Sequence, residues 1–227
     1  MLKDLLSLIY PTVCAACGRS LYRNENCICT HCHYKLPQTK FHLSAINPVA
    51  KLFWGRVSLN AACSYYSFSK GGSVQKLVHQ LKYQGRKEIG VTIGKFYGTE
   101  LRDSISFRSV NTIVPVPLHE EKNRKRGFNQ SEVFAQGISA GMDLPMDPAN
   151  LVRVKATTTQ TRRSRYDRWK NVETVFKIKD HEKLEGRHVL LVDDVVTTGA
   201  TLEACAQAIL KVPGTMVSIA TIAYAEI

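Results

Sequence analysis

The acid pair Asp193 and Asp194 is the part of this chain best placed to do chemistry. It directly follows an apolar run, 189–192, which predicts a fully buried strand in the middle of a parallel sheet. Open α/β sheets bind their ligands at the carboxyl ends of their strands, where the two carboxylates are expected. Paired carboxylates at such an edge accept hydrogen bonds from neighbouring hydroxyl groups, such as those of a sugar.

A turn rich in hydroxyl groups, the threonine turn 197–201, follows the acid pair and predicts an anion site. Its backbone N–H groups and the positive end of the following helix favour an anion, and its hydroxyls add donors. Acid pair and turn together predict a clamp for a ribose 5-phosphate. The alternative is a Rossmann-like strand and helix with acidic residues at the strand end. The helix is indicated by apolar residues at helical spacing: Leu202, Cys205, Ala206 and Ile209.

This order of strand, acid pair and Thr-Thr-Gly-x-Thr turn resembles the signature of the type I phosphoribosyltransferases, which bind 5-phosphoribosyl-1-pyrophosphate (PRPP). The resemblance implies an α/β fold with a central, mainly parallel sheet flanked by helices. It implies that Asp193 and Asp194 are the catalytic residues and face the ribose 2′- and 3′-hydroxyls, while the turn holds the 5′-phosphate. The PRPP-binding residues expected on this segment are Val195, Val196, Thr197, Thr198, Gly199, Ala200 and Thr201.

Two C-x2-C pairs near the start of the chain predict a metal site. Cys14 and Cys17 form one pair and Cys29 and Cys32 the other, separated by eleven residues. Each pair can place two thiolates on one ion, and four thiolates complete the closed tetrahedral shell of a structural Zn²⁺ site. So short a segment has few core residues, so we expect its folding to depend on the metal. With no free ligand position, its role is expected to be structural or partner-binding.

A disulfide framework and a redox pair are the alternatives for these cysteines. Nothing in the sequence points to export, which argues against disulfides. Cys27 and His33 are ambiguous neighbours, because either can replace Cys29 or Cys32 in the shell. Only Cys29 and Cys32 have the matching spacing.

The middle of the chain predicts strands alternating with helices. A strand is expected at 61–68, a helix from about Ser73, and a second helix over 87–103. Between the helices, Lys82 and Arg86 flank a glycine turn and are candidates to reach a phosphate of PRPP. Solvated surface is the alternative for both cations.

A strand expected at 112–117 runs into prolines, which stiffen the chain where the sheet ends. The pyrophosphate loop of phosphoribosyltransferases lies at the corresponding sheet edge, so the resemblance implies that Pro115 and Val116 lie beside PRPP. Further strands are expected at 175–177, 188–192 and 217–223.

Two basic segments have two functional interpretations, contact with pyrophosphate or with nucleic acid. The first, a basic loop expected at 122–126, contains Arg124 and Arg126; solvated surface is its alternative. The second, 157–171, interleaves cations with aromatic residues and predicts either a lid over pyrophosphate or a nucleic-acid contact strip. An exposed, salt-bridged helix is the alternative for the second. Its arginines are Arg162, Arg163, Arg165 and Arg168.

The whole chain resembles the ComF family of competence-associated phosphoribosyltransferase-like proteins. The resemblance rests on the order of the cysteine pairs, Leu81-Lys82-Tyr83, 114–118, 126–130 and the PRPP clamp. It implies binding of PRPP with Mg²⁺ and a role in DNA uptake, in which internalised single-stranded DNA is handled in the cytoplasm. It also implies a helicase or translocase of the competence machinery as a partner of the zinc module. Members named for gluconate metabolism share the architecture, so the pathway stays open.

Length and charge agree with this interpretation. The 227 residues allow an N-terminal helix and zinc finger, 1–40, and a phosphoribosyltransferase-like domain, 41–227. Within that domain we expect a hood and acceptor side at 41–110 and a PRPP-binding core at 111–227. A net charge of +12 favours polyanions, including nucleic acid. No stretch approaches the roughly 18–20 apolar residues of a membrane span, so we expect a cytoplasmic protein, with peripheral contact at the inner face of the membrane as a minor option.

Two functions remain open at this level. A transferase would displace pyrophosphate from C1 of PRPP with electrostatic help from the protein and Mg²⁺, and no dedicated general base is evident. The sequence ends after the last expected strand, so a C-terminal hood is not expected, and 41–110 shows no acceptor motif. The protein is therefore expected to be either a PRPP-binding adaptor for single-stranded DNA, or an active phosphoribosyltransferase of nucleobase or amine metabolism without a DNA role.

Overall fold

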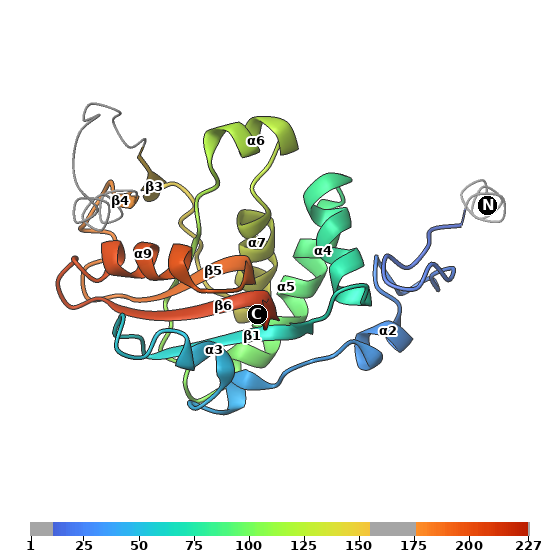
Figure 1. Ribbon diagram of the computed structural model, residues 1–227, viewed down its shortest axis with the longest axis horizontal. Helices are drawn as coiled ribbons and strands as arrows, with labels where there is room; N and C mark the ends of the chain where they lie inside the picture. Colours follow the sequence, from blue (N-terminus) through green and yellow to red (C-terminus); the bar gives the residue numbers. More distant parts are fainter. Residues whose placement is uncertain (1–10, 155–175, 227) are drawn as a thin grey trace.

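Four parallel strands form the central sheet of the computed structural model, which describes residues 11–154 and 176–226. The strands are β1 (Ala61–Phe68), β2 (Thr112–Pro115), β5 (His188–Val196) and β6 (Met216–Ala225). They lie in the order β1-β6-β5-β2, and each neighbouring pair is parallel (Figure 1). Val192 lies opposite Pro115 of β2 and Ala220 of β6, so β5 has a neighbour on each side.

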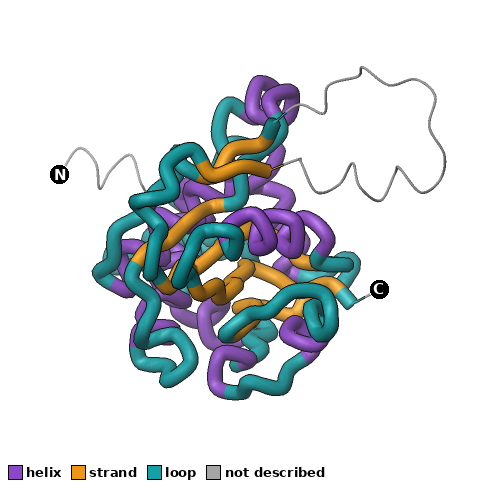
Figure 2. The backbone as a smooth tube through the Cα atoms, turned by 90° about the vertical axis from the view of Figure 1, so that its left-hand side faces the viewer, coloured by secondary structure: helices purple, strands orange, loops and turns teal. Residues whose placement is uncertain are grey.

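Helices cover both faces of this sheet. They are α3 (Pro48–Lys51), α4 (Ser73–Tyr83), α5 (Lys87–Arg102), α7 (Gln130–Met142) and α9 (Ala200–Ile209). Leu190 and Val192 of β5 belong to the core shared with α4, α5 and α7, whereas Val189 and Leu191 belong to a second core with α3 and α9. Figure 2 shows the strands in the middle with helices around them. Because both faces are covered, the strand is apolar at every one of these positions.

Helices α5 and α7 lie in direct backbone contact. A Cβ atom at Gly94 of α5 would collide with the carbonyl oxygen of Phe134, and one at Gly141 of α7 would lie 2.6 Å from the carbonyl oxygen of Lys95. Only residues without a side chain permit so close an approach. The glycines therefore fix α7 against α5, and the first turn of α7 reaches the acid pair on β5.

Shorter elements complete the described part of the chain. Helix α6 follows β2, stands at the top of Figure 1 and contains no buried residue. Two short antiparallel strands form a ladder of their own, with Leu151 opposite Ile178, beside the main sheet (Figures 1 and 2). The bounds of these elements are α2 (Thr30–Lys35), η1 (Phe41–Leu43), α6 (Glu120–Arg126), β3 (Leu151–Arg153) and β4 (Phe176–Ile178).

The cysteine head, residues 11–36, is docked on α4 and α5. Gln80 Nε2 of α4 donates a hydrogen bond to the Ala15 carbonyl oxygen at 2.7 Å. The His33 ring packs against Phe96 of α5 with ring centroids 4.1 Å apart. The head is therefore joined to the helical layer that also carries α7.

Most elements expected from the sequence are confirmed. The strand at 61–68 is present, and the helix expected over 87–103 ends one residue earlier, at Arg102. Strand β5 is longer than expected, because it continues past the acid pair to Val196. The strand expected at 112–117 stops at Pro115, and the one expected at 175–177 lies one residue later.

The basic loop expected at 122–126 is wrong, since these residues belong to helix α6. The helix begins after His119 and ends at Gly127, whose φ of 74° is the left-handed conformation that closes a helix. No apolar face is buried, so the sequence carries no helical periodicity here. Among the described helices, none combines the length and apolar character of a membrane span.

Candidate functional site

The acid pair lies near the end of β5 and is held by three other groups. Asp193 Oδ1 accepts a hydrogen bond from Ser131 Oγ at 2.7 Å and another from the backbone N–H of Asp194 at 2.8 Å. Asp194 Oδ1 lies 2.9 Å from Lys82 Nζ. Ser131 comes from the first turn of α7 and Lys82 from the last turn of α4, so two helices of one layer fix the two carboxylates.

Burial sets the charge of the acid pair. It raises the pKa of Asp193 to about 7, and the negative charge of Asp194 adds to the rise. The hydrogen bond from Ser131, the N–H of Asp194 and the cation of Lys82 oppose it. The two half-buried carboxylates thus have Lys82 as a neighbouring cation, which partly offsets their negative charge.

The threonine turn lies next to the acid pair and opens α9. Asp193 and residues 195–202 line one small cavity of about 60 Å³. Gly199 adopts a φ of 76° directly before the first helical residue, Ala200. The free N–H groups at the start of this ten-residue helix favour an anion. A group with hydroxyls at one end and a phosphate at the other matches this order of carboxylates and donors.

Residues after α3 support the threonine turn from behind. A Cβ atom at Gly199 would lie 2.9 Å from Phe53 Cε1, so the turn rests on the Phe53 ring. Arg56 Nη1 donates to the Thr198 carbonyl oxygen at 3.0 Å, and its Nη2 pairs with Glu203 in the first turn of α9. With its carbonyl held by Arg56, the turn has a defined backbone conformation.

The proline segment, residues 115–118, begins at the end of β2 beside β5, and the backbone groups of Val116 already have partners. The Val116 N–H donates to the Val192 carbonyl oxygen at 2.9 Å, and the Val116 carbonyl oxygen accepts from Asn129 Nδ2 at 2.9 Å. Asn129 also caps α7, because its side chain accepts from the Ser131 N–H. Contact of Pro115 and Val116 with PRPP stays a prediction.

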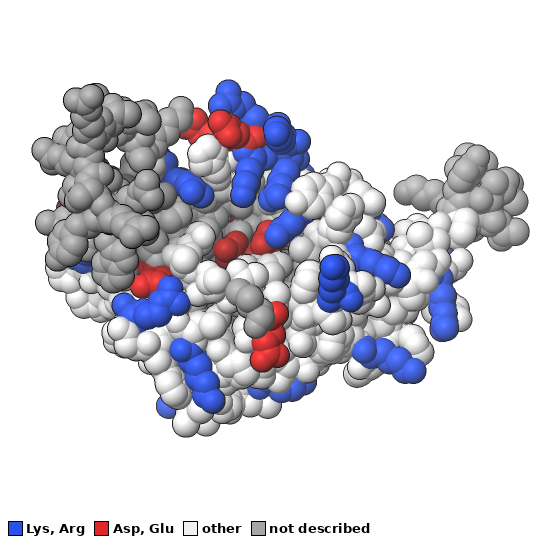
Figure 3. Space-filling view, in the orientation of Figure 1, with Lys and Arg blue, Asp and Glu red and all other residues white. Residues whose placement is uncertain are grey.

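A basic groove, lined by Lys82, Tyr83, Gly85, Lys122, Lys125 and Arg126, lies between α4 and α6 and has a volume of about 230 Å³. Basic side chains gather over α6 at the rim of a hollow in which acidic groups are visible (Figure 3). Lys82 is common to the groove and to the ion pair with Asp194. The structure thus brings Arg126 to the groove, whereas Arg124 is exposed and does not line it.

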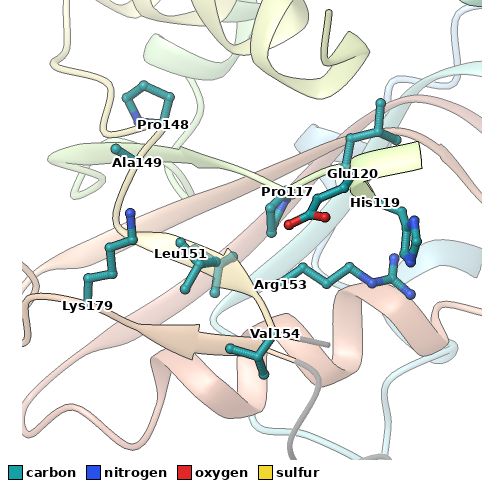
Figure 4. A pocket seen from close by; sticks show the side chains of 11 residues that line it. Pro117, His119, Glu120, Pro148, Ala149, Leu151, Arg153, Val154 and Lys179 are labelled. Atoms are coloured by element: carbon teal, nitrogen blue, oxygen red, sulfur yellow. The ribbon is translucent and has the colours of Figure 1, made fainter. Parts of the chain in front are cut away.

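A larger cavity of about 470 Å³ separates the proline segment from the β3–β4 ladder. Glu120, Arg153 and Lys179 line it together with Pro117 and Leu151 (Figure 4). Its lining thus contains charges of both signs. The arginines expected to form a lid or a nucleic-acid strip, Arg162, Arg163, Arg165 and Arg168, lie outside the described residues.

The four cysteines of the C-x2-C pairs converge as expected. The sulphurs of Cys14, Cys17, Cys29 and Cys32 all lie within 4.8 Å of one another. The Cys17 and Cys29 sulphurs are 3.8 Å apart, which equals the edge of about 3.8 Å of a tetrahedron with Zn–S bonds of about 2.3 Å. Backbone N–H groups of Cys29 and Cys32 point at the cluster, toward Cys14 and Cys29 Sγ. The arrangement fits a metal site.

The two ambiguous neighbours lie away from this cluster. The Cys27 thiol donates to the Glu88 carbonyl oxygen at 3.5 Å, and the His33 ring packs on Phe96. Within the cluster, burial raises the pKa of the Cys14 thiol, but backbone N–H groups, above all that of Cys29, outweigh burial and lower the pKa to about 7. Burial and the neighbouring thiols raise the pKa of Cys32. Four thiolates therefore need a cation to coexist here.

Comparison with known proteins identifies the family. A family model described as phosphoribosyl transferase domain matches residues 129–226. The DNA utilization protein YhgH of Escherichia coli K12 is 31% identical over 210 residues, which cover 91% of this chain and 87% of that protein. Competence protein F of Haemophilus influenzae is 32% identical over 139 residues, covering 60% of this chain and 61% of that protein. This chain belongs to the ComF family.

The ComF chain has the type I phosphoribosyltransferase fold, with the acid pair and threonine turn inside the matched domain. A purine phosphoribosyltransferase from Pyrococcus horikoshii aligns with a TM-score of 0.39 and 20% identity, over 61% of this chain and 81% of that one. The cysteine head precedes the matched residues, as the resemblance to the ComF family implies.

Three residues of the ComF site were not expected from the sequence: Ser131, Phe53 and Arg56. A signal for Ser131 existed, because α7 is the helix after β2 that packs on the sheet, and its first turn must lie at the edge where the parallel strands end. No local pattern distinguishes Phe53 or Arg56. Lys82 was expected to reach a phosphate, and in the structure it pairs with Asp194.

Proposed function

We propose that this ComF protein binds PRPP together with Mg²⁺ at the acid pair and the threonine turn. The observation that carries the proposal is the common cavity that Asp193 and the turn line at the start of α9. Asp193 and Asp194 accept hydrogen bonds from the ribose hydroxyls, and the N–H groups and hydroxyls of 197–201 bind the 5′-phosphate. Ser131 and Arg56 hold the carboxylate and the turn in place.

The carboxylates of the acid pair would hold Mg²⁺ together with the ligand's own oxygens, as this cation prefers. When bound, Mg²⁺ neutralises part of the pyrophosphate charge. Lys82, which pairs with Asp194, offers a second positive charge beside the acid pair. Four thiolates of the head would hold one structural Zn²⁺, which stabilises a segment with little core of its own.

Calorimetry with PRPP and Mg²⁺ tests this proposal directly. Asp193→Asn with Asp194→Asn removes both carboxylates while keeping their size, and we expect a loss of affinity of about a hundredfold or more, since hydrogen bonds to charged groups are each worth about 1.5–3 kcal/mol. Asp103→Asn, an exposed aspartate far from the site, is the matched control. Unchanged affinity of the double variant would exclude this site.

We further propose that the protein handles internalised single-stranded DNA in the cytoplasm during DNA uptake, with a helicase or translocase bound through its head and with peripheral contact at the inner face of the membrane. The net charge of +12 and the names of the relatives, a DNA utilization protein and a competence protein, support this role. The test is binding of single-stranded DNA at increasing salt, with Arg162, Arg163, Arg165 and Arg168 changed to Ala. Absence of DNA binding at low salt would contradict it.

The second candidate is an active phosphoribosyltransferase of nucleobase or amine metabolism without a DNA role. The match to the phosphoribosyl transferase domain favours it. Release of pyrophosphate from PRPP, measured with nucleobases, amines and single-stranded DNA as acceptors, separates the two. Turnover with a small acceptor and no DNA binding would select the enzyme; PRPP binding with no turnover would select the adaptor.

A further inference from the structure

The basic groove between α4 and α6 contains an aromatic ring that a phosphate site does not need. Lys122, Lys125 and Arg126 from α6 face Lys82 and Tyr83 from α4, and no carboxylate of the described residues lines the groove. Tyr83 is 64% exposed at the end of a helix whose apolar residues are otherwise buried. An exposed ring beside four cations combines the two features that single-stranded nucleic acid requires.

The Tyr83 ring is held in a defined orientation. The Arg126 guanidinium lies over it at 5.2 Å from the ring centroid, and the His79 ring is 4.9 Å away on the same helix. Arg126 in turn donates to Gln130 Oε1 at 2.7 Å, which ties it to α7. A ring fixed in this way loses little freedom when a base stacks on its open part.

The acidic groups near the groove have partners of their own or lie at its rim. Asp194 pairs with Lys82, and Glu88 pairs with Arg86. Glu120 and Glu121 occupy the first turn of α6, away from the last turn that carries Lys125 and Arg126. The surface therefore keeps a net positive charge along the face that Tyr83 shares.

We propose that this groove binds single-stranded nucleic acid, with an unpaired base stacked on Tyr83 and its phosphodiester between Lys82 and the cations of α6. The inference rests on the proposed DNA-handling function and names the surface that performs it. In a duplex the base faces are covered by their neighbours, so a single exposed ring selects unpaired bases. Because Lys82 also pairs with Asp194, a strand bound in this groove would lie beside the acid pair.

Fluorescence anisotropy with a labelled oligothymidine of about 12 nucleotides tests this surface on the full chain. Tyr83→Ala should weaken binding about fivefold or more, whereas Tyr83→Phe should bind normally, because stacking needs the ring and not the hydroxyl. Tyr34→Ala, which removes an exposed aromatic of the head, is the matched control and should have no effect. Lys122→Gln with Lys125→Gln should lower the slope of log affinity against log salt by about 1.4, and Lys51→Gln with Lys211→Gln should not.

Two results would overturn the proposal, and they differ from failure of DNA handling itself. If wild-type protein binds the oligonucleotide and neither the Tyr83→Ala nor the lysine variant changes affinity or salt slope, the strand binds elsewhere. If inorganic pyrophosphate displaces the oligonucleotide and the lysine variant loses PRPP affinity, the groove belongs to pyrophosphate. Absence of DNA binding by wild-type protein at low salt would instead remove the DNA-handling function together with this surface.

Discussion

The cysteine head and the hollow formed by Asp193, Asp194 and the threonine turn both gather groups that suit a small ligand, but the chain builds them differently. In the head, all four sulphurs come from residues 14–32, and the backbone of the same segment donates to them. In the hollow, the carboxylates of β5 depend on Ser131 from α7 and Lys82 from α4, while Arg56 after α3 supports the turn. Local spacing therefore determines which groups meet the ligand, whereas the tertiary structure determines their charge and orientation.

If the head is self-contained and is held together by a metal ion, loss of that ion should produce the largest effect. We expect Cys29→Ser to abolish zinc binding and to unfold the head, because metal binding supplies on the order of 10 kcal/mol of folding free energy in such modules. Zinc content by mass spectrometry and limited proteolysis of the head measure both effects.

Cys27→Ser is the matched control, because this buried thiol lies only two residues from Cys29 but outside the cluster. It should keep one zinc per chain. Loss of zinc from Cys27→Ser with retention in Cys29→Ser would show that the cluster uses a different set of sulphurs.

If tertiary neighbours tune the hollow, PRPP affinity should depend on pH through Asp193. In the proposed site Asp193 binds the ribose hydroxyls and Mg²⁺ as a carboxylate, and its pKa is raised to about 7, so affinity should fall about tenfold for each pH unit below 7. The folded pKa exceeds the ordinary value of 3.8, so the same group lowers the free energy of unfolding as pH rises from about 4 to 7.

Ser131→Ala separates this titration from that of the ligand's own phosphates. The Ser131 hydrogen bond lowers the pKa of Asp193, so its removal should move the midpoint of the affinity profile to higher pH. Ser139→Ala, on the same helix, is the control, because its hydroxyl bonds to the Leu144 carbonyl oxygen instead. Identical profiles for Ser131→Ala and wild type would mean that α7 does not tune the acid pair.

A smaller effect is expected from substitution of Gly199, at which the threonine turn packs on the Phe53 ring. Gly199→Ala must place a side chain at a φ of 76° and bring its Cβ to 2.9 Å from the ring, so it should lower the free energy of unfolding by about 2–3 kcal/mol. Gly71→Ala has a similar φ of 79° but nothing within 4 Å, so about 1–2 kcal/mol is expected. Urea unfolding measures the difference, and equal losses would remove Phe53 as a support.

The smallest effect is expected from Arg56→Ala. The Arg56 side chain contacts the Thr198 carbonyl oxygen and Glu203 and is 38% exposed. Loss of these contacts should therefore weaken PRPP binding by at most about fivefold. Arg102→Ala, which breaks an exposed pair with Asp103, should leave the affinity unchanged. A loss in Arg56→Ala as large as that of the acid-pair variant would place Arg56 in direct contact with the ligand.

The sequence alone predicts those features whose residues lie close together in the chain or follow a regular apolar periodicity. The cysteine pairs, the acid pair and the threonine turn each lie within a few residues, and β1 and α5 have the apolar periodicity of their elements. Helix α6 escaped prediction because it buries no residue and so shows no apolar face. An exposed helix depends on its cap and on its closing glycine, which give weaker signals than a buried stripe.

The groups that tune the site were not predictable, because their positions depend on how separate elements pack. Ser131 lies 62 residues from Asp193, and Arg56 lies 142 residues from Thr198. Neither residue is unusual in its local sequence. Lys82 was singled out for its charge, but its pairing with Asp194 requires α4 to end beside β5.

The glycine contact between α5 and α7 joins the two helices into one rigid unit. A side chain at Gly94 or Gly141 would collide with the main chain of the opposite helix, so glycine is needed for the two backbones to lie this close. At the start of α5, the Glu88 carbonyl oxygen accepts a hydrogen bond from the Cys27 thiol of the head. At the start of α7, Ser131 donates a hydrogen bond to Asp193. The head and the acid pair are therefore attached to the same rigid pair of helices, so a shift of either helix would be felt at both sites.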